Sequence, residues 1–461
     1  MKKLAAILLA VLFVVGASAC KTASPSTPTA SILPSISTIT VPNEEMPSSK
    51  EPSSEESSSK PSSNQESSEP SSEEETSSPS STPTPETPNP NGGGTPSTNT
   101  TPVIKPADHT SHYCYPKLSD IQKQYYSAMH SAVLDMHSSW IVLGPLSDNY
   151  SADIAVARQA FVADHPEIFW LANNYVTAKG KDSNGNPAAL LMFSSADNTT
   201  SYLVTRSEKT HMEAELNKAV ANIVSKVTAT DPFEIEAQLL SLLCEKVTYS
   251  ADPADPFKYS AYGALVNGRA LCEGYSRAMQ LLLSQFNIPC TTVTGIANGE
   301  GHMWNLVQIS NQWYNLDATW SDTANNFVSF EYFNLTDADI ALDHTFAKDF
   351  SEISPETLSG VSFNITKPSC TATEYNYFSK RGFILTPDNT AELVSYIVSS
   401  ADKTIEVKFK DQAFANQFKA NAEAILTDIN TRLAAITPAL PYYIGFYSPS
   451  THTVKLQKTD K

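Results

Sequence analysis

The chain has 461 residues, and its 49 acidic side chains outnumber the 31 basic ones, giving a formal net charge of −18 at pH 7. This negative balance and the absence of a basic stripe argue against nucleic-acid binding, which depends on clustered Lys and Arg. Six cysteines do not form a dense disulfide framework in a chain of this length, so their roles are expected to differ.

The first 20 residues have the pattern of an export signal. Two lysines precede an apolar run at residues 4–15, and small residues then lead to Cys20. These small residues resemble a bacterial lipobox, although Ala17 stands where leucine is commoner. The resemblance implies cleavage before Cys20, lipid attachment to its sulfur, and a place on the extracellular face of the bacterial cell membrane. The alternatives are secretion after an ordinary cleavage nearby and an uncleaved anchor, although the apolar run is short for a permanent span.

Residues 21–106 are dominated by Ser, Pro, Thr and Glu, with almost no aromatic residue and few large aliphatic ones. Such a segment cannot bury an apolar core and is expected to be disordered. Proline stiffens it and the glutamates between Glu44 and Glu86 repel one another, so we expect an extended tether that crosses a cell-wall layer. Its acidity accounts for much of the net charge.

The remaining chain is long enough for two or three compact units, and three composition zones divide it. The first zone is residues 107–230. Apolar residues recur at helical spacing at 117–140 and 152–163. Short strand-like segments follow at 188–193 and 200–204. This order predicts an N-terminal α+β unit. Two further amphipathic helices are expected at 209–227 and 232–247, and the second belongs to the next zone.

The second zone, residues 231–365, carries the strongest functional signal. Gly268 and a polar loop lead into apolar residues at helical spacing. These residues are Tyr275, Ala278, Met279, Leu282 and Phe286. Cys272 is therefore expected at the N-terminus of a helix. There the unpaired backbone N–H groups and the positive end of the helix dipole favour a thiolate over a thiol.

Two short segments with strand character follow the predicted helix. One begins at His302, the other ends at Trp320, and the turn-like pair Ser310 and Asn311 separates them. If the strands pair as a hairpin, His302 near the start of one lies beside Asp317 near the end of the other. The carboxylate of Asp317 would then fix the imidazole tautomer and stabilise its cation.

Residues 234–322 resemble the transglutaminase-like branch of the papain-like cysteine enzymes through three motifs in order. The motifs read ALCEGYSRA around Cys272, GEGHMWNLV around His302 and YNLDATW around Asp317. In that family a cysteine begins a helix, a glycine-flanked histidine opens a strand and an aspartate closes the next. The phrase AYGALVNGRALCEGY, with HMWN and LDATWSD, is most similar to bacterial surface transglutaminase-like proteins. The resemblance implies an α+β fold, with a cysteine-bearing helix packed on an antiparallel sheet and smaller α+β units at both ends.

The resemblance also implies a role for each of the three residues: Cys272 as nucleophile, His302 as general base and acid, and Asp317 as its orienter. The thiolate would attack a carboxamide or peptide carbonyl of a surface protein or wall peptide and form a thioester. An amine acceptor gives transamidation, whereas water gives deamidation or peptide hydrolysis, and the residues leave this choice open. No cofactor and no metal are expected.

Two alternatives belong to other functional classes. The fold could serve as a catalytically silent surface binding or scaffolding module, with the three residues retained only as core. It could also be an adhesin in which the tether and the C-terminal unit matter more. A reactive Cys272 thiol would favour the enzyme, and a slowly reacting one the binding module.

One departure from the family concerns the oxyanion. The animal cross-linking enzymes use a Trp upstream of the cysteine, and here no Trp lies between Trp170 and Trp304. The backbone N–H of Cys272 supplies one donor, and the Tyr262 hydroxyl is a candidate second, although a packing role fits a buried aromatic better. The segment from Asp252 lacks the ligand spacing of a calcium loop and is interpreted as a turn.

The third zone, residues 366–461, predicts a C-terminal α+β unit with a helix at 390–400, a strand at 405–410, a long helix at 412–436 and a closing hairpin. It has no catalytic signature. The cysteines that remain after Cys20 and Cys272 are buried thiols or form up to two bridges. They are Cys114, Cys244, Cys290 and Cys370.

Overall fold

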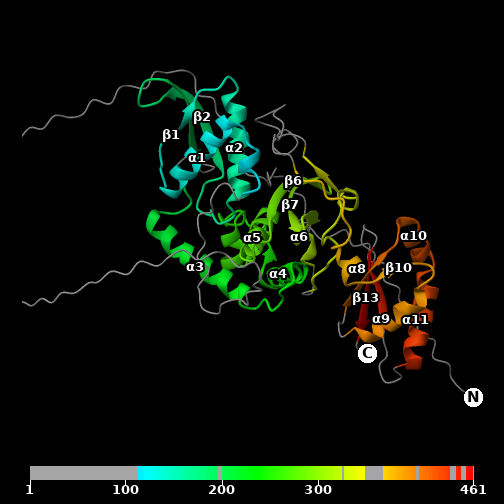
Figure 1. Ribbon diagram of the computed structural model, residues 1–461. Coiled ribbons are helices and arrows are strands. Elements are labelled where there is room, and N and C mark those ends of the chain that lie inside the picture. Colours follow the sequence, from blue (N-terminus) through cyan, green and yellow to red (C-terminus); the bar gives the residue numbers. More distant parts are fainter. Residues whose placement is uncertain are drawn as a thin grey trace, which may run out of the picture. The chain divides into compact units, whose positions relative to one another are not determined.

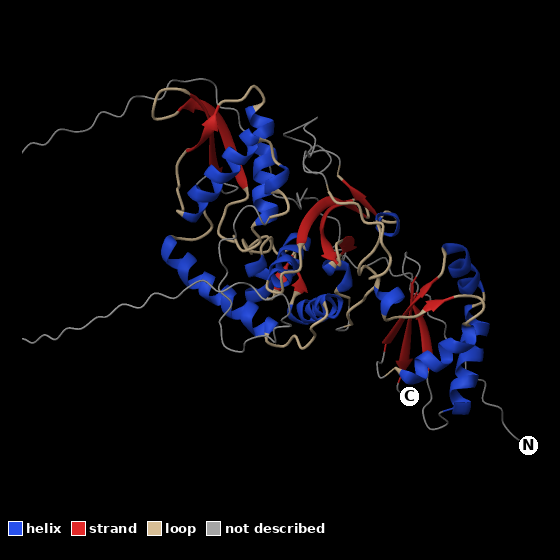
Figure 2. Ribbon diagram, in the orientation of Figure 1, coloured by secondary structure: helices blue, strands red, loops and turns tan. Residues whose placement is uncertain are grey.

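The computed structural model of the protein describes residues 112–194, 200–323, 327–347, 367–400, 404–436, 443–447 and 453–459. The predicted signal segment with Cys20 and the tether at 21–106 lie outside these described residues. Figure 1 traces the helices and strands along the chain, and Figure 2 colours them by type. Among the described residues most strand pairs are antiparallel and only two short pairs are parallel, and this mixture of helices and antiparallel sheets confirms the α+β prediction.

The first part of the chain is a three-stranded antiparallel sheet with two helices that pack on each other. Its elements are η2 (Tyr115–Lys117), α1 (Asp120–Leu134), β1 (Ile141–Pro145), α2 (Tyr150–Asp164), β2 (Asn174–Lys181) and β3 (Pro187–Ser194), with strand order β1-β3-β2. Ser119 begins α1 with a capping box, accepting from the Gln122 N–H while Gln122 accepts from the Ser119 N–H. The strands β1 and β2 were not predicted, and the helical pattern predicted to residue 140 ends earlier, at Leu134.

Two helices connect this part to the segment that holds the three motifs. α3 (Arg206–Val224) begins at a Thr205–Glu208 capping box, and α4 (Pro232–Lys246) begins at Asp231, whose carboxylate accepts from two backbone N–H groups. Both helices lie where the periodicity predicts them. Buried residues from Cys114 to Phe333 form one continuous hydrophobic cluster, so α1 to α4 share a core with the helix and strands that follow.

The central sheet is antiparallel and has the strand order β8-β7-β6-β9. Its strands are β6 (Cys290–Ala297), β7 (Glu300–Ile309), β8 (Gln312–Leu316) and β9 (His344–Phe346). Ser310 and Asn311 both have positive φ and join β7 to β8 in a two-residue hairpin, with Ile309 opposite Gln312. The predicted hairpin is therefore present.

The helix α5 (Cys272–Ser284) packs on β6 and β7, with a strongly apolar side that buries Tyr275, Met279 and Leu282. A short π-helix, η3 (Gly263–Asn267), and the paired strands β4 (Thr248–Tyr249) and β5 (Arg269–Ala270) precede it. Gly274 allows the preceding loop to lie against the helix, since a Cβ there would be 2.7 Å from the Lys258 carbonyl oxygen. Two short helices, α6 (Ala318–Ser321) and α7 (Asp337–Ile340), follow the sheet.

The C-terminal part forms a four-stranded sheet with a second hydrophobic cluster. Its elements are α8 (Tyr377–Lys380), β10 (Ile384–Leu385), α9 (Thr390–Ser399), β11 (Thr404–Phe409), α10 (Gln412–Ala420), α11 (Ala422–Ile436), β12 (Tyr443–Tyr447) and β13 (Thr453–Thr459), with strand order β10-β11-β13-β12. The helices α10 and α11 lie along one face of this sheet (Figure 2). The strand at 405–410 and the closing antiparallel pair agree with the prediction.

The predicted single helix at 412–436 is wrong, because it is two helices separated at Asn421. The Asn421 side-chain amide donates to the Gln417 carbonyl oxygen, an acceptor in the last turn of α10. Asparagine competes in this way with the helical hydrogen bonds, which favours ending a helix. Among the described residues, no helix is both long enough and apolar enough to span a bilayer.

Candidate active site

Cys272 is the first residue of α5, as the sequence predicts, and its side chain is buried. The Ser276 hydroxyl, one turn later, contacts both the Cys272 carbonyl oxygen at 2.9 Å and the Met303 carbonyl oxygen at 3.0 Å. These contacts tie the start of α5 to β7 next to His302. The N–H groups of the first turn have no acceptor within the helix and are available to stabilise negative charge near the sulfur.

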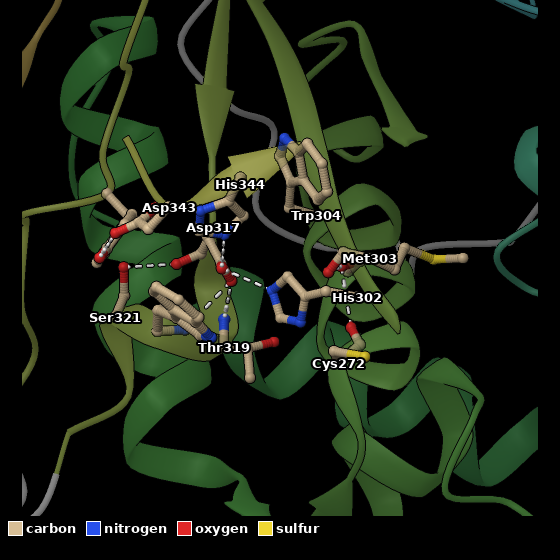
Figure 3. A network of polar contacts seen from close by, with 12 residues as sticks. Cys272, His302, Met303, Trp304, Asp317, Thr319, Ser321, Asp343 and His344 are labelled. Carbon is tan, nitrogen blue, oxygen red and sulfur yellow. Dashed lines mark hydrogen bonds and ion pairs between the residues drawn. The ribbon is translucent and has the colours of Figure 1, made fainter. Parts of the chain in front are cut away.

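His302 and Asp317 form a buried ion pair at the end of the hairpin. His302 lies near the start of β7 and Asp317 directly follows β8, and the Nε2 to Oδ2 distance is 2.7 Å. Figure 3 shows the imidazole lying between the Asp317 carboxylate and Cys272. The structure thus brings together the three residues that the motifs single out, with Asp317 on one side of the ring and the thiol on the other.

Asp317 is held in place by the helix that it begins. Its Oδ1 accepts from the backbone N–H groups of Thr319 at 2.9 Å and Trp320 at 3.1 Å, so it is the N-cap of α6. This cap uses one carboxylate oxygen and leaves the other for the imidazole. The same side chain therefore fixes the local backbone and orients His302.

The charges at the site reinforce one another. Burial alone would lower the pKa of His302, but the charge and hydrogen bond of Asp317, together with the neighbouring Cys272 sulfur, raise it to about 10. Burial acts to raise the pKa of Asp317, and the imidazoles of His302 and His344 outweigh it and hold that pKa well below its usual range. An imidazolium next to Cys272 at neutral pH is the partner that stabilises a thiolate.

His344 is a further member of this cluster that the sequence did not reveal. Its Nε2 lies 3.1 Å from the same Asp317 Oδ2, and its Nδ1 lies 2.5 Å from Asp343 Oδ1. It is the first residue of β9, the edge strand that pairs with β6. No motif marks it, since it is 27 residues beyond Asp317 and only the pairing of β9 brings it there. The spacing of residues along the sequence therefore does not predict that His344 lies in the site.

Gly295 makes this pairing of β9 with β6 close. A Cβ at Gly295 would be 2.1 Å from the Thr345 carbonyl oxygen and 2.8 Å from the Trp304 ring. Glycine therefore lets β9 approach β6 and lets the Trp304 indole pack beneath it. The Trp304 Nε1 donates to Asn315 Oδ1 at 3.0 Å, which satisfies the buried indole.

Replacing His344 by glutamine is expected to raise the pKa of His302 further. Burial would lower the pKa of His344, but Asp317 and Asp343 raise it, so its charge lies near His302. Glutamine removes that cation, which otherwise disfavours the protonated form of His302. NMR titration of the histidine rings checks this, with the exposed His211→Gln as control. An unchanged His302 titration in folded His344→Gln protein would show that the two imidazoles are not coupled.

The candidate oxyanion donor Tyr262 has another partner. Its hydroxyl donates to Glu215 Oε2 at 2.6 Å on α3, and its ring packs against Phe169 with a centroid distance of 4.8 Å. Burial and Glu215 raise the pKa of Tyr262. This tyrosine therefore connects α3 to the core. The first-turn N–H groups of α5 remain the candidate oxyanion donors.

The other described cysteines are unbridged thiols: Cys114, Cys244, Cys290 and Cys370. Burial raises the pKa of each, to about 12 for Cys370 and well above the ordinary range for the other three. Of the two predicted states, thiols and bridges, the structure has thiols, which are buried at Cys114, Cys244 and Cys370 and partly buried at Cys290. In the native state they are expected to react slowly with alkylating reagents.

The same cluster has a spacing that a metal ion could use. The ligand atoms of His302, Asp317 and His344 lie within 4.8 Å of one another, and two nitrogens with one carboxylate suit zinc. The Nε2 atoms of His302 and His344 are both hydrogen-bonded to Asp317 Oδ2. An ion bound there would replace these bonds and withdraw His302 from Cys272.

The family match covers the region in which the three residues lie. Residues 220–318 match the family model described as the transglutaminase-like superfamily, whose members are generally cysteine-dependent enzymes. Residues 220–318 therefore form a transglutaminase-like domain, which confirms the resemblance drawn from the motifs. No curated protein matches the sequence significantly.

Two solved structures are similar to part of the chain. One is described as "a TGase", with 14% identity, a TM-score of 0.23, and coverage of 33% of this chain and 52% of that chain. The other, from Cytophaga hutchinsonii, is named "a Putative Cysteine Protease", with 14% identity, a TM-score of 0.20, and coverage of 31% and 61%. This chain thus spans between half and two thirds of the length of each.

Proposed function

We propose that the protein is a cysteine-dependent acyl transferase or amide hydrolase that acts on protein or peptide amides through Cys272, His302 and Asp317. The observation that carries this proposal is the 2.7 Å ion pair between His302 and Asp317, which orients a raised-pKa imidazole next to a cysteine at a helix N-terminus. This arrangement supplies a nucleophile, a proton donor and an orienting carboxylate.

The proposed reaction has two steps. The Cys272 thiolate attacks the carbonyl carbon, and the first-turn N–H groups of α5 stabilise the oxyanion. The C–N bond breaks as His302 donates its proton to the leaving amine or ammonia, which leaves a thioester. An acceptor amine or water then gives a proton to His302 and attacks the thioester, and the C–S bond breaks to release thiolate and product. A lysine-type amine gives transamidation, whereas water gives deamidation or hydrolysis.

Trapping the thioester tests the proposal. The protein is incubated with glutamine-containing peptides and with hydroxylamine as acceptor, and intact-mass measurement and hydroxamate formation are followed. We expect an acyl adduct on Cys272, hydroxamate product, and neither in Cys272→Ala protein. Rapid alkylation of Cys272 near neutral pH, with slow alkylation of the other four described thiols, is the accompanying expectation.

A second candidate function is a catalytically silent surface binding or scaffolding module. The observation that favours it is the burial of Cys272, whose exposed fraction is 1%. This candidate predicts no adduct with any amide and an alkylation rate for Cys272 as slow as that of Cys244. Both results together would contradict the enzymatic proposal.

The proposed location is the extracellular face of a bacterial membrane, with a lipid on Cys20 and residues 21–106 as a tether. The support is the lysine-led apolar run and the small residues before Cys20. The proposed substrate is accordingly a surface protein or wall peptide. Metabolic labelling with a fatty acid should mark the wild type but not Cys20→Ser, and equal labelling of both would contradict the lipid anchor.

A further inference from the structure

A pocket lies on the side of α5 that contacts α2, next to the start of the helix. The pocket is small, and part of it is open to solvent. Arg158 of α2, Tyr259 of the loop before η3, and Glu273 and Arg277 of α5 line it. Glu273 directly follows Cys272 in the chain, whereas Cys272 itself does not line the pocket.

Two buried cations and a single carboxylate line this pocket. The Nε and an Nη of Arg277 donate to Glu273 Oε1 at 2.9 and 2.7 Å, which pairs these two residues. Arg158 is 2% exposed and donates to the Asn173 carbonyl oxygen at 2.6 Å. Among the described residues, no carboxylate oxygen lies within 4.0 Å of its guanidinium, and its Nε has no acceptor. One positive charge in the pocket is therefore uncompensated.

An unpaired buried charge is costly, and proteins normally pair such a charge or let it bind a counter-ion. Arg158 remains charged at neutral pH, because a guanidinium does not lose its proton in this range. The ring of Tyr175 contacts the guanidinium at 5.0 Å from the ring centroid, which offers a weak attraction but no countercharge. A ligand carboxylate in the pocket would supply the missing charge and an acceptor for Nε.

Tyr259 connects this pocket to the proposed nucleophile. Burial raises the pKa of this half-buried phenol, and the nearby Glu273 and Cys272 raise it further. The same phenol is therefore close to a pocket carboxylate and to the reacting sulfur. Under the proposal below, a ligand in the pocket would extend past Tyr259 towards Cys272.

We propose that the pocket binds a carboxylate of the amide substrate through Arg158, so that the substrate is a peptide or amide with a free carboxylate near its reacting carbonyl. Its identity as substrate rests on the proposed function, whereas binding of a carboxylate does not. The alternative occupant is water that bridges Arg158 Nε to Glu273 Oε2, an atom that also has no partner among the described residues. With water alone the pocket would have no affinity for carboxylates.

Calorimetric titration of glutarate into the full chain carrying Cys272→Ala tests carboxylate binding without catalysis. We expect saturable binding of glutarate. The neutral diamide of glutarate should bind at least about tenfold more weakly, since it cannot form charge-assisted hydrogen bonds to arginine. Arg158→Gln should weaken glutarate binding about tenfold or more, and Arg158→Lys should weaken it less. Arg269→Gln, which removes the same charge at an exposed position before Cys272, should bind as the parent does.

Thermal unfolding shows whether Arg158→Gln is folded, and if it is not, the glutarate and diamide pair and Arg158→Lys carry the test. Absence of saturable glutarate binding, or equal binding of glutarate and diamide, would overturn the proposal. So would unchanged binding by folded Arg158→Gln.

Kinetics separate this proposal from the enzymatic one. If the protein binds glutarate but never forms a thioester, the pocket is a carboxylate-binding site that has no role in binding a substrate. If thioester does form, Arg158→Gln should raise the KM of acidic peptides about tenfold and leave the KM of neutral ones unchanged. Equal KM values for acidic and neutral peptides in the wild type would overturn the substrate assignment.

Discussion

Replacing His302 by alanine is expected to lower kcat/KM for acyl transfer by about 10²- to 10⁴-fold. In the proposed mechanism the variant loses the group that donates a proton to the leaving amine, and it also loses the cation next to the Cys272 sulfur. Hydroxamate formation from a glutamine peptide measures the first loss. The rate of Cys272 alkylation against pH measures the second, and the reactive limb at low pH should disappear.

The matched control is His211→Ala, because His211 is an exposed histidine on α3 with 77% of its side chain accessible. It should retain the wild-type rate and the wild-type alkylation profile. Cys272→Ala supplies the background in both assays. Wild-type kinetics in His302→Ala protein would show that His302 takes no part in the reaction.

The raised pKa of His302 also sets an upper limit to the active pH range. Since this pKa is about 10, the imidazolium persists through neutral pH and is lost as pH rises through about 10. If the proposed reaction requires the proton on His302, its rate should therefore fall as the pH rises through about 10. A rate that continues to rise through this range would show that proton donation by His302 does not limit the reaction.

Replacing Asp317 by alanine is expected to lower the free energy of unfolding by about 3–5 kcal/mol near pH 5, since it leaves buried cationic groups without their partner. It removes the acceptor for His302 and His344 and the N-cap of α6. Urea unfolding of the wild type and the variant at several pH values measures the difference.

The pH dependence of this difference follows from the two shifts. The raised pKa of His302 gives a stabilisation that is complete below the unfolded value of about 6.5 and is lost as pH rises through about 10. The lowered pKa of Asp317 gives a second stabilisation, which is complete above the unfolded pKa of about 3.9 and is lost as the pH falls below that value towards the folded pKa. The difference should therefore be largest between about pH 4 and 6.5 and smaller at pH 10.

Asp317→Asn is the matched control for the cap. Its side-chain oxygen can still accept from Thr319 and Trp320, so it keeps the start of α6 and removes only the charge. It should be more stable than Asp317→Ala and equally inactive. Equal unfolding free energies for wild type and Asp317→Ala at pH 5 would contradict a stabilising role for the ion pair.

Local sequence rules were sufficient where neighbouring residues decide the structure. The apolar spacing after Cys272 fixes α5, because one face of a helix has to be buried. Ser310 and Asn311 fix the β7–β8 hairpin, since a two-residue turn requires residues that tolerate positive φ. This hairpin in turn determines that His302 and Asp317 meet. The same rules were wrong at Asn421, where a single polar side chain divides a periodic pattern.

Tertiary structure alone decided what surrounds these residues. His344 reaches Asp317 because β9 pairs with β6 at Gly295, and Arg158 reaches the start of α5 because α2 packs beside it. Such contacts join segments far apart in the chain, and they depend on close packing of whole elements rather than on residue spacing. The sequence by itself therefore determined the helix, the hairpin and the transglutaminase-like motifs. Only the packing of the folded chain could decide the second imidazole at Asp317 and the uncompensated charge of Arg158 in the pocket that Glu273 lines.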